Sequence, residues 1–225
     1  MDNDVLRQAP LFSALDDEAA TALRNSMSES KLRRGDVLFS EGDSGDKLYI
    51  VLDGKVKLGR SATDGRENLL AIMGPGQMFG ELSLFDPGPR SATVTAVTDA
   101  SFASLSHEDL LRWLDGRPIV ARGLLSQLAA RLRKSNDVVA DLVFSDVPGR
   151  VAKALLDLAD RFGRTADDGV HVHHDLTQEE LAQLVGASRE TVNKALADFA
   201  SRGWVRLEPR SVVIMDVERL SKRAR

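Results

Sequence analysis

The sequence predicts an α+β protein built from an N-terminal antiparallel β-domain, a long helix, and a small C-terminal domain rich in helices. Three observations predict this class. Glycine-bounded strand patterns occupy the first half of the chain, a seven-residue apolar repeat follows, and two short helices joined by a tight turn lie near the C-terminus. The 225 residues also exceed what one small domain needs, which suggests more than one module.

The β-rich stretch runs from Gly35 to Gly88 and contains 10 of the 17 glycines. Apolar segments at residues 48–52 and 69–73 are short and bounded by glycine, and the residues from Ala92 to Ala96 alternate between apolar and polar. Many short strands separated by glycine turns indicate an antiparallel sandwich or barrel.

A long helix is predicted to begin at Pro118, since proline fits the first position of a helix. Small and apolar residues then recur at alternating spacings of four and three: Ala121, Leu125, Leu128, Leu132, Ser135, Val139 and Leu142. This heptad seam is typical of a coiled coil and favours a two-fold dimer. The alternative is a helix packed on its own domain, with Leu124 and Val138 turned inward. Ser135 is unusual because it puts a hydroxyl on an otherwise apolar seam.

The residues Asp146, Pro148 and Gly149 mark a boundary after the long helix. Beyond it, the pattern predicts an amphipathic helix over residues 151–162 and a polar loop over residues 164–175 that includes a short strand at 170–172. The C-terminal domain is thus expected to begin with a helix.

Two short helices joined by a tight turn follow. Thr177 and Glu180 form a capping box, in which each side chain accepts a hydrogen bond from a free backbone amide at the helix start. Gly186 permits a sharp turn and Ser188 caps a second helix that extends from Ser188 to Arg202. A helix, a glycine turn and a helix with a polar N-terminal face form a helix-turn-helix, which binds the DNA major groove. The alternative is a merely solvated polar surface.

The first two turns of the second helix carry side chains that suit base edges: Arg189, Glu190, Thr191, Asn193 and Lys194. Arginine forms two bonds with guanine, and glutamate accepts one from cytosine. Residues 204–207 and 211–214 then predict a β-hairpin, or wing, on which Arg206 and Arg210 are placed to meet phosphates.

The net charge of −4 does not argue strongly against DNA binding, because its distribution is uneven. The chain from Asp146 onward holds 13 basic and 13 acidic residues, so the negative excess lies before it. The absence of cysteine excludes disulfides, cysteine zinc sites and thiol nucleophiles. No apolar run is long enough to span a membrane and the acidic N-terminus is unlike a signal peptide, so we expect a cytoplasmic protein without membrane contact.

A second constellation suggests a small-molecule site. A short turn of helix is expected to start at Gly80, and its free backbone amides favour an anion. Arg90 returns across a tight loop, and its planar guanidinium suits a phosphate. Glu81 is placed to hold a sugar hydroxyl. The alternative is a surface ion pair between Glu81 and Arg90.

Both constellations resemble one known family. The segment from Gly80 to Ser83, followed by Arg90-Ser91-Ala92, resembles the phosphate-binding cassette of cyclic-nucleotide-binding domains. The segment from Gly186 to Val192 resembles the recognition motif of the CRP/FNR family of bacterial transcription regulators. The resemblance covers nearly the whole chain in the same order, and it is closest to the actinobacterial cyclic-AMP receptor proteins.

The resemblance implies three regions: a jelly-roll-like β-roll at residues 1–116 that binds a cyclic nucleotide, a dimerisation helix and hinge at 117–145, and a winged helix-turn-helix at 146–225. The implied effector is cyclic AMP, with no metal and no catalytic residue. The implied partners are a second copy of the chain, a palindromic double-stranded operator, and RNA polymerase. Ligand bound between subunits is expected to change how the long helices pack and thus how the two recognition helices are spaced.

The resemblance also implies roles for individual residues. Arg90 and Ser91 would bind the cyclic phosphate and Glu81 the ribose 2′-hydroxyl. The other implied ligand contacts are Leu70, Ala71, Gly80, Leu82, Ser83, Ser135 and, from the partner subunit, Asn136. The implied DNA contacts are Thr177, Gln178, Ser188, Arg189, Glu190, Asn193 and Lys194, and the seam from Ala121 to Leu142 forms the dimer interface.

Three alternatives remain at this stage. One alternative is an effector-independent DNA binder of similar structure whose pocket is vestigial. An enzyme or a kinase-type regulatory subunit is disfavoured, because no nucleophile–base pair or phosphate-binding loop of the Walker type is present. A haem or metal sensor is also disfavoured, since His171, His173 and His174 lie in a loop of the C-terminal domain with no cysteine.

Overall fold

The computed structural model describes residues 3–9, 11–12, 15–62, 65, 67–86, 88–115 and 117–224, with backbone only at residues 3, 83 and 84. The described chain divides into two compact units. The first comprises residues 1–60 and 70–134, and the second comprises residues 61–69 and 135–225. Gly116, where the sequence places the end of the β-domain, lies outside the described residues.

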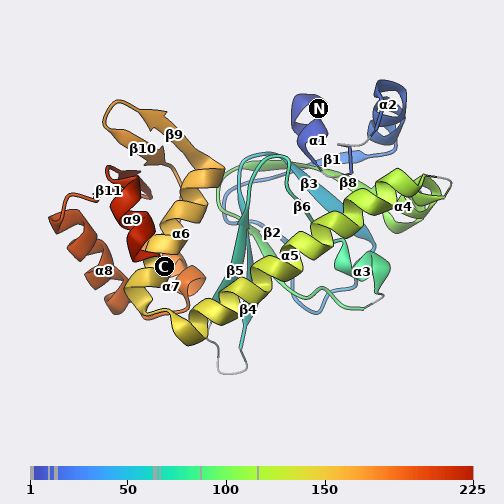
Figure 1. Cartoon of the computed structure of the whole chain (residues 1–225). Coiled ribbons are helices and arrows are strands. Elements are labelled where there is room, and N and C mark those ends of the chain that lie inside the picture. Colours follow the sequence, from blue (N-terminus) through green and yellow to red (C-terminus); the bar gives the residue numbers. More distant parts are fainter. Residues whose placement is uncertain are drawn as a thin grey trace. The chain divides into compact units, whose positions relative to one another are not determined.

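Two antiparallel sheets form the centre of the first unit, as the glycine-bounded strand patterns predict (Figure 1). One sheet has the order β1-β8-β3-β6, with bounds Ser28–Leu32, Ala100–Ser106, Lys47–Asp53 and Met78–Phe79. The other has the order β2-β7-β4-β5, with bounds Val37–Phe39, Thr93–Ala96, Val56–Ser61 and Glu67–Met73. A buried cluster draws Phe79 and Phe102 from the first sheet and Val94 from the second, so the core lies between the sheets.

Short helices complete the first unit. They are α1 (Asn3–Gln8), α2 (Asp17–Asn25), α3 (Leu82–Phe85) and α4 (His107–Leu114). Ser106 caps α4 by accepting from the amide of Asp109 at 3.1 Å. A second buried cluster includes Leu23 of α2, Leu110 of α4 and Ile50 of β3. The apolar faces of these helices therefore pack on the sheet that contains β3.

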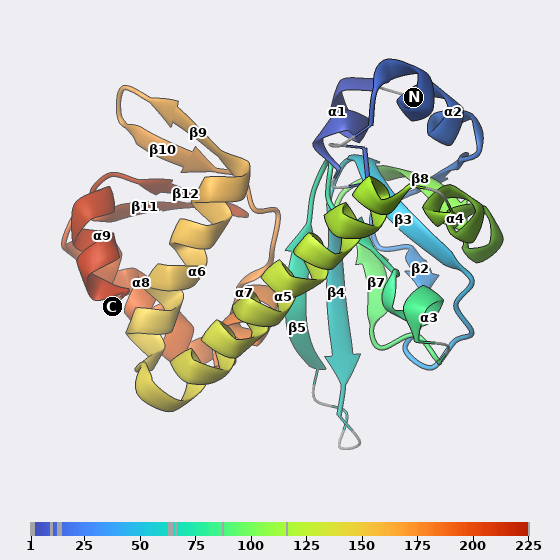
Figure 2. The ribbon, with the colours of Figure 1, turned by 45° about the vertical axis from the view of Figure 1, so that its right-hand side comes forward.

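The long helix α5 spans Pro118–Phe144, and its start at Pro118 confirms the sequence prediction (Figure 2). Val120 and Leu124 are buried. The side chains of the heptad seam are exposed by contrast, to 65% at Leu125 and 64% at Leu132. Val138, which the alternative interpretation turned inward, is 48% exposed. The single chain therefore presents most of its heptad seam to solvent.

The second unit begins with α6 (Val147–Phe162), which starts earlier than the predicted residue 151. Asp146 is the N-cap and accepts from the amide of Gly149 at 2.9 Å, and proline lies in the first turn. All three residues that suggested a boundary are compatible with a helix start, because the first-turn amides have no partner within the helix. The expected helix is correct in kind but its predicted beginning was wrong.

A third antiparallel sheet, of order β11-β12-β10-β9, belongs to the second unit. Its strands are Val205–Glu208, Ser211–Ile214, Gly169–Val172 and Gly163–Ala166. The expected polar loop after α6 is thus a hairpin, of which only the strand near residues 170–172 was predicted (Figure 2). The helices are α7 (Gln178–Val185), α8 (Arg189–Ser201) and α9 (Val217–Arg223), and α6 contacts all three.

Candidate functional site

Local backbone chemistry positions the first candidate site, at α7 and α8. The Thr177 hydroxyl accepts from the Glu180 amide at 3.1 Å, and the Glu180 carboxylate accepts from the Thr177 amide at 2.8 Å. The capping box is confirmed. Gly186 ends α7 with φ of 69°, where a side chain would be strained, and Ser188 caps α8 by accepting from the Thr191 amide. The predicted helix, glycine turn and second helix are all present.

The predicted DNA-contacting side chains meet at the start of α8. The Gln178 amide oxygen accepts from Arg189 at 3.3 Å and from Asn193 at 3.2 Å, so α7 and α8 contribute to one polar surface. Lys194 forms an ion pair with Glu190 at 2.7 Å, and both side chains are exposed. These exposed pairs contribute little to folding, which leaves the surface available to exchange them for base or phosphate contacts.

The wing differs from the sequence expectation at Arg206. Its guanidinium binds Asp168 at 2.8 Å and Glu208 at 3.3 Å, so it is already paired within the small sheet. Hydrogen bonds from His171 and Arg206 lower the pKa of Asp168 to about 2. Arg206 therefore ties the β9–β10 turn to β11, rather than standing free for a phosphate.

The second candidate site is a pocket in the first unit. It is lined by Phe39, Leu58, Phe79, Gly80, Glu81, Leu82, Arg90, Ser91, Ala92, Val94 and Arg131. Gly80 has φ of 82°, and a Cβ there would lie 2.9 Å from Nη1 of Arg90 and 3.0 Å from the carbonyl oxygen of Lys47. Only glycine allows this approach. The short helix α3 begins at Leu82, two residues later than expected, with Glu81 as its N-cap.

Arg90 and Glu81 are both buried in this pocket but are not paired with each other. Arg90 is 4% exposed, and its Nη1 and Nη2 donate to the carbonyl oxygens of Gly80 and Lys47, each at 2.9 Å. Glu81 is 1% exposed and forms its ion pair with Arg131 of α5, with 2.5 Å between Nη1 and Oε1. Burial lowers the pKa of Arg90. The surface ion pair considered from the sequence was therefore wrong.

Two buried polar atoms of this pocket lack a partner among the described residues: Oε2 of Glu81 and Nε of Arg90. A buried acceptor or donor without a partner costs free energy on the order of 1–3 kcal/mol, so each such atom needs an explanation. Oε2 of Glu81 is a hydrogen-bond acceptor, and Nε of Arg90 is a donor. The pair suits a ligand that carries a hydroxyl and an anion.

The structure places some of the predicted ligand residues in the pocket but not others. Gly80, Glu81, Leu82, Arg90 and Ser91 line the pocket. Leu70 and Ala71 do not appear in the lining, and Leu70 is 51% exposed. The side chain of Ser83 lies outside the described part of the structure.

Ser135 and Asn136 belong to the second unit and are exposed on α5. Their implied adenine contacts stay predictions, since the two units are described separately. Sequence reasoning missed Arg131 and Phe39 in the pocket. Arg131 stands one helical turn before Ser135, which was the available signal. Nothing in the sequence pattern singles out Phe39.

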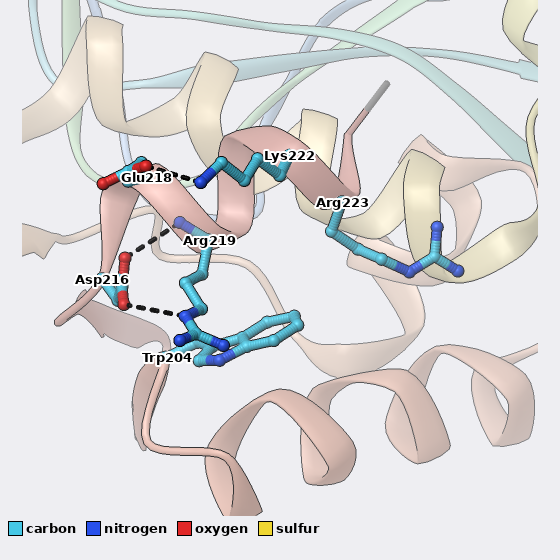
Figure 3. Close-up of a pocket in the computed structure, with 6 residues that line it drawn as sticks. All are labelled: Trp204, Asp216, Glu218, Arg219, Lys222 and Arg223. Atoms are coloured by element: carbon cyan, nitrogen blue, oxygen red, sulfur yellow. Dashed lines mark hydrogen bonds and ion pairs between the residues drawn. The ribbon is translucent and has the colours of Figure 1, made fainter.

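A wider hollow of about 680 Å³ lies in the second unit, between Trp204 and α9 (Figure 3). Its charged side chains already have partners: Asp216 pairs with Arg219 and Glu218 with Lys222 (Figure 3), and Arg223 pairs with Asp146. The side chains of the first two pairs are substantially exposed. Size alone favours this hollow as the ligand-binding site. The smaller pocket of the first unit, however, has buried, unpartnered atoms that a specific ligand can hydrogen-bond.

Comparison with known proteins assigns a family to each unit. The profile described as "Cyclic nucleotide-binding domain" matches residues 29–117, and the profile described as "Crp-like helix-turn-helix domain" matches residues 149–223. No described helix is long and apolar enough to cross a membrane. No group of three or more histidine, aspartate or glutamate side chains among the described residues is placed to hold a metal ion.

Two relatives are similar to this chain over nearly its whole length, and a third relative is a single domain. The chain is 55% identical over 223 residues to the "CRP-like cAMP-activated global transcriptional regulator" of Mycobacterium tuberculosis, covering 99% of this chain and 100% of that protein. It is 38% identical to the catabolite activator protein of Thermus thermophilus, with a TM-score of 0.56 and 96% and 98% of the two chains covered. It is 62% identical to the N-terminal domain of a transcriptional regulator from Streptomyces coelicolor, with a TM-score of 0.51 and 64% and 99% covered.

Proposed function

This chain belongs to the CRP family of transcription regulators, and we propose that it acts as a dimer whose ligand pockets set the spacing of two DNA-reading helices. It is a cyclic-AMP-responsive, DNA-binding regulator, like the relatives named above.

The single observation that carries the ligand assignment is the pair of unpartnered buried atoms on Glu81 and Arg90. Cyclic AMP fits them, because its ribose 2′-hydroxyl is a donor for the carboxylate and its cyclic phosphate is an anion for the guanidinium. Ser91 adds a hydroxyl beside the phosphate, and Gly80 lets the backbone approach. Arg131 holds the carboxylate of Glu81 from the long helix, which connects the pocket to α5.

The DNA assignment rests on the exposed polar face where α7 meets α8. We assign base contacts to Arg189, Glu190 and Lys194, with Asn193 beside them. Thr177, Gln178 and Ser188 are placed at helix starts, where hydroxyl and amide groups meet phosphates. The Gln178 bonds to Arg189 and Asn193 hold both side chains in one orientation, which supports base reading by a prepared surface.

The dimer assignment rests on the open heptad seam of α5. Its exposed members include Leu125, Leu132, Val139 and Leu142, which would otherwise leave an apolar stripe in water. Two copies related by a two-fold axis place two recognition helices in successive major grooves of a palindromic operator, roughly 34 Å apart.

The ligand is proposed to act through the seam. Ser135 of the same subunit and Asn136 of the partner subunit would contact the adenine, so that bound ligand favours one packing of the two α5 helices. The junction at Asp146 transmits that packing to α8. Such a ligand shifts the population by no more than its differential affinity for the two states. The protein is expected in the cytoplasm with its DNA, and RNA polymerase is a further partner through which a bound regulator acts.

A titration tests this function. Cyclic AMP is added to the full-length protein and a fluorescent palindromic operator, and DNA affinity is measured by anisotropy. We expect affinity to rise with ligand in the wild type and to stay unchanged for Arg90→Ala. Identical curves for the two proteins would overturn the ligand assignment. Calorimetric titration with cyclic AMP separates the alternative, a regulator with a vestigial pocket, which binds the operator but gives no binding isotherm with the ligand.

A further inference from the structure

Arg90 is a buried cation that forms no ion pair with any carboxylate among the described residues. No described carboxylate lies within ion-pair distance of its guanidinium, and Glu81 is held by Arg131 instead. Two backbone carbonyls accept from its terminal nitrogens, while Nε has no partner. A charged group removed from water needs compensation that carbonyl dipoles supply only in part.

An aromatic face supplies further compensation. The guanidinium carbon of Arg90 lies 4.3 Å from the centre of the Phe39 ring and 5.8 Å from the centre of the Tyr49 ring. The negative face of an aromatic ring attracts a cation, and this attraction is strongest where water is excluded. Phe39 is the nearer ring, and it also lines the pocket.

The ring of Phe39 is itself held in place by other aromatic side chains. Its centre is 5.8 Å from that of Tyr49 and 6.2 Å from that of Phe79, in tilted arrangements that aromatic pairs favour. Phe39 comes from β2 in one sheet, whereas Tyr49 and Phe79 come from β3 and β6 in the other. The sandwich therefore fixes the ring against which Arg90 lies.

We propose that Phe39 is a positioning residue for ligand binding: its ring face holds the Arg90 guanidinium in the pocket in place of a carboxylate, so that the cation stays available to the phosphate. A carboxylate partner would hold the guanidinium equally well, but the ligand anion would then have to displace it. A ring stabilises the cation without competing for the positions that a phosphate oxygen occupies. This inference rests on the proposed function, since it deepens the cyclic-AMP site.

The test compares two substitutions of similar size in the full-length protein. Phe39→Met keeps an apolar side chain but removes the ring, whereas Phe39→Tyr keeps the ring. Cyclic AMP affinity is measured by calorimetry at a temperature where circular dichroism shows every variant folded. Loss of a desolvated cation–ring contact predicts binding weakened about tenfold in Phe39→Met, and affinity within about threefold of wild type in Phe39→Tyr.

A matched control separates positioning from general packing. Phe102 belongs to the same aromatic cluster, with ring centres 6.1 Å from Phe79 and 6.5 Å from Tyr49, but it makes no cation–ring contact with Arg90. Phe102→Met is expected to lower the thermal midpoint, because it removes packing from the core. It should change cyclic AMP affinity less than threefold, because no cation–ring contact is lost.

Three results would each overturn the inference: equal affinities of wild type and Phe39→Met, equal weakening by Phe39→Met and Phe102→Met, or loss of affinity in Phe39→Tyr. A wild-type protein that gives no binding isotherm with cyclic AMP would instead refute the proposed function itself, so the two failures are distinct.

Discussion

Arg131 of the long helix binds Glu81 of the ligand cassette, with 2.5 Å between Nη1 and Oε1, and also donates from Nη2 to the carbonyl oxygen of Met78. Fifty residues separate the two charged side chains in sequence. Glu81 is almost completely buried, while Arg131 is about one-third exposed. The contact therefore joins α5 to the pocket within the first unit, and it suggests how occupancy of the pocket reaches the helix.

Replacing Arg131 by alanine should destabilise the first unit, because it leaves the buried carboxylate of Glu81 without its cation. Removing one partner of a buried pair costs several kcal/mol, and we expect about 2 kcal/mol here because Arg131 keeps some solvent contact. Calorimetric unfolding of the full chain should show a lower midpoint temperature for the transition of the first unit. Arg133→Ala, an exposed arginine of the same helix, is the control. Equal midpoints for both variants would contradict the prediction.

Leu132→Glu should convert the dimer to a monomer, since it places a charge in the centre of the apolar seam. Sedimentation equilibrium should then give the 24.5 kDa mass of one chain, and operator affinity should fall because two half-sites are no longer bound together. Ala130→Glu changes an exposed residue off the seam and should leave the dimer intact. A Leu132→Glu protein that sediments as a dimer would show that the seam is not the interface.

Arg189→Ala should weaken operator binding and relax sequence preference. A lost arginine–guanine pair costs about 1–3 kcal/mol of discrimination, so affinity for the operator should drop about tenfold or more while affinity for unrelated DNA changes little. Competition binding with both DNAs measures the ratio. Arg164→Ala, an exposed arginine on β9, is the matched control. A uniform loss on both DNAs would mean that Arg189 contacts a phosphate instead.

The lowered pKa of Asp168 predicts acid sensitivity of the small sheet. Its pKa is about 2, against an ordinary value of 3.8, because His171 and Arg206 hydrogen-bond to the carboxylate. The folded state thus favours the ionised form, so the stabilisation is complete above pH 3.8 and is lost as the pH falls through 2. A carboxyl NMR titration should show the low midpoint. Arg206→Ala should move it upward, and an unchanged midpoint would refute the role of Arg206.

Much of the second unit could be predicted because its signals are local. The capping box of Thr177 and Glu180, the glycine turn at Gly186 and the cap at Ser188 each depend on residues within one helical turn. The start of α6 was missed although its cap at Asp146 is equally local. Pro148 and Gly149 are turn residues by type, and only the hydrogen bond from Gly149 to Asp146 distinguishes a helix start from a loop.

The sequence by itself determined the order of the elements, the period of the α5 seam, and the residue types of both sites, because periodicity and capping are properties of neighbouring residues. Tertiary structure alone decided the partners inside the pocket. Glu81 lies in a pocket with two arginines, and the packing of α5 places Arg131 rather than Arg90 within ion-pair distance of its carboxylate. Arg90 in turn received the ring of Phe39 from a strand 51 residues earlier. Such choices depend on which side chains the two sheets and the helix bring together, and no local pattern encodes them.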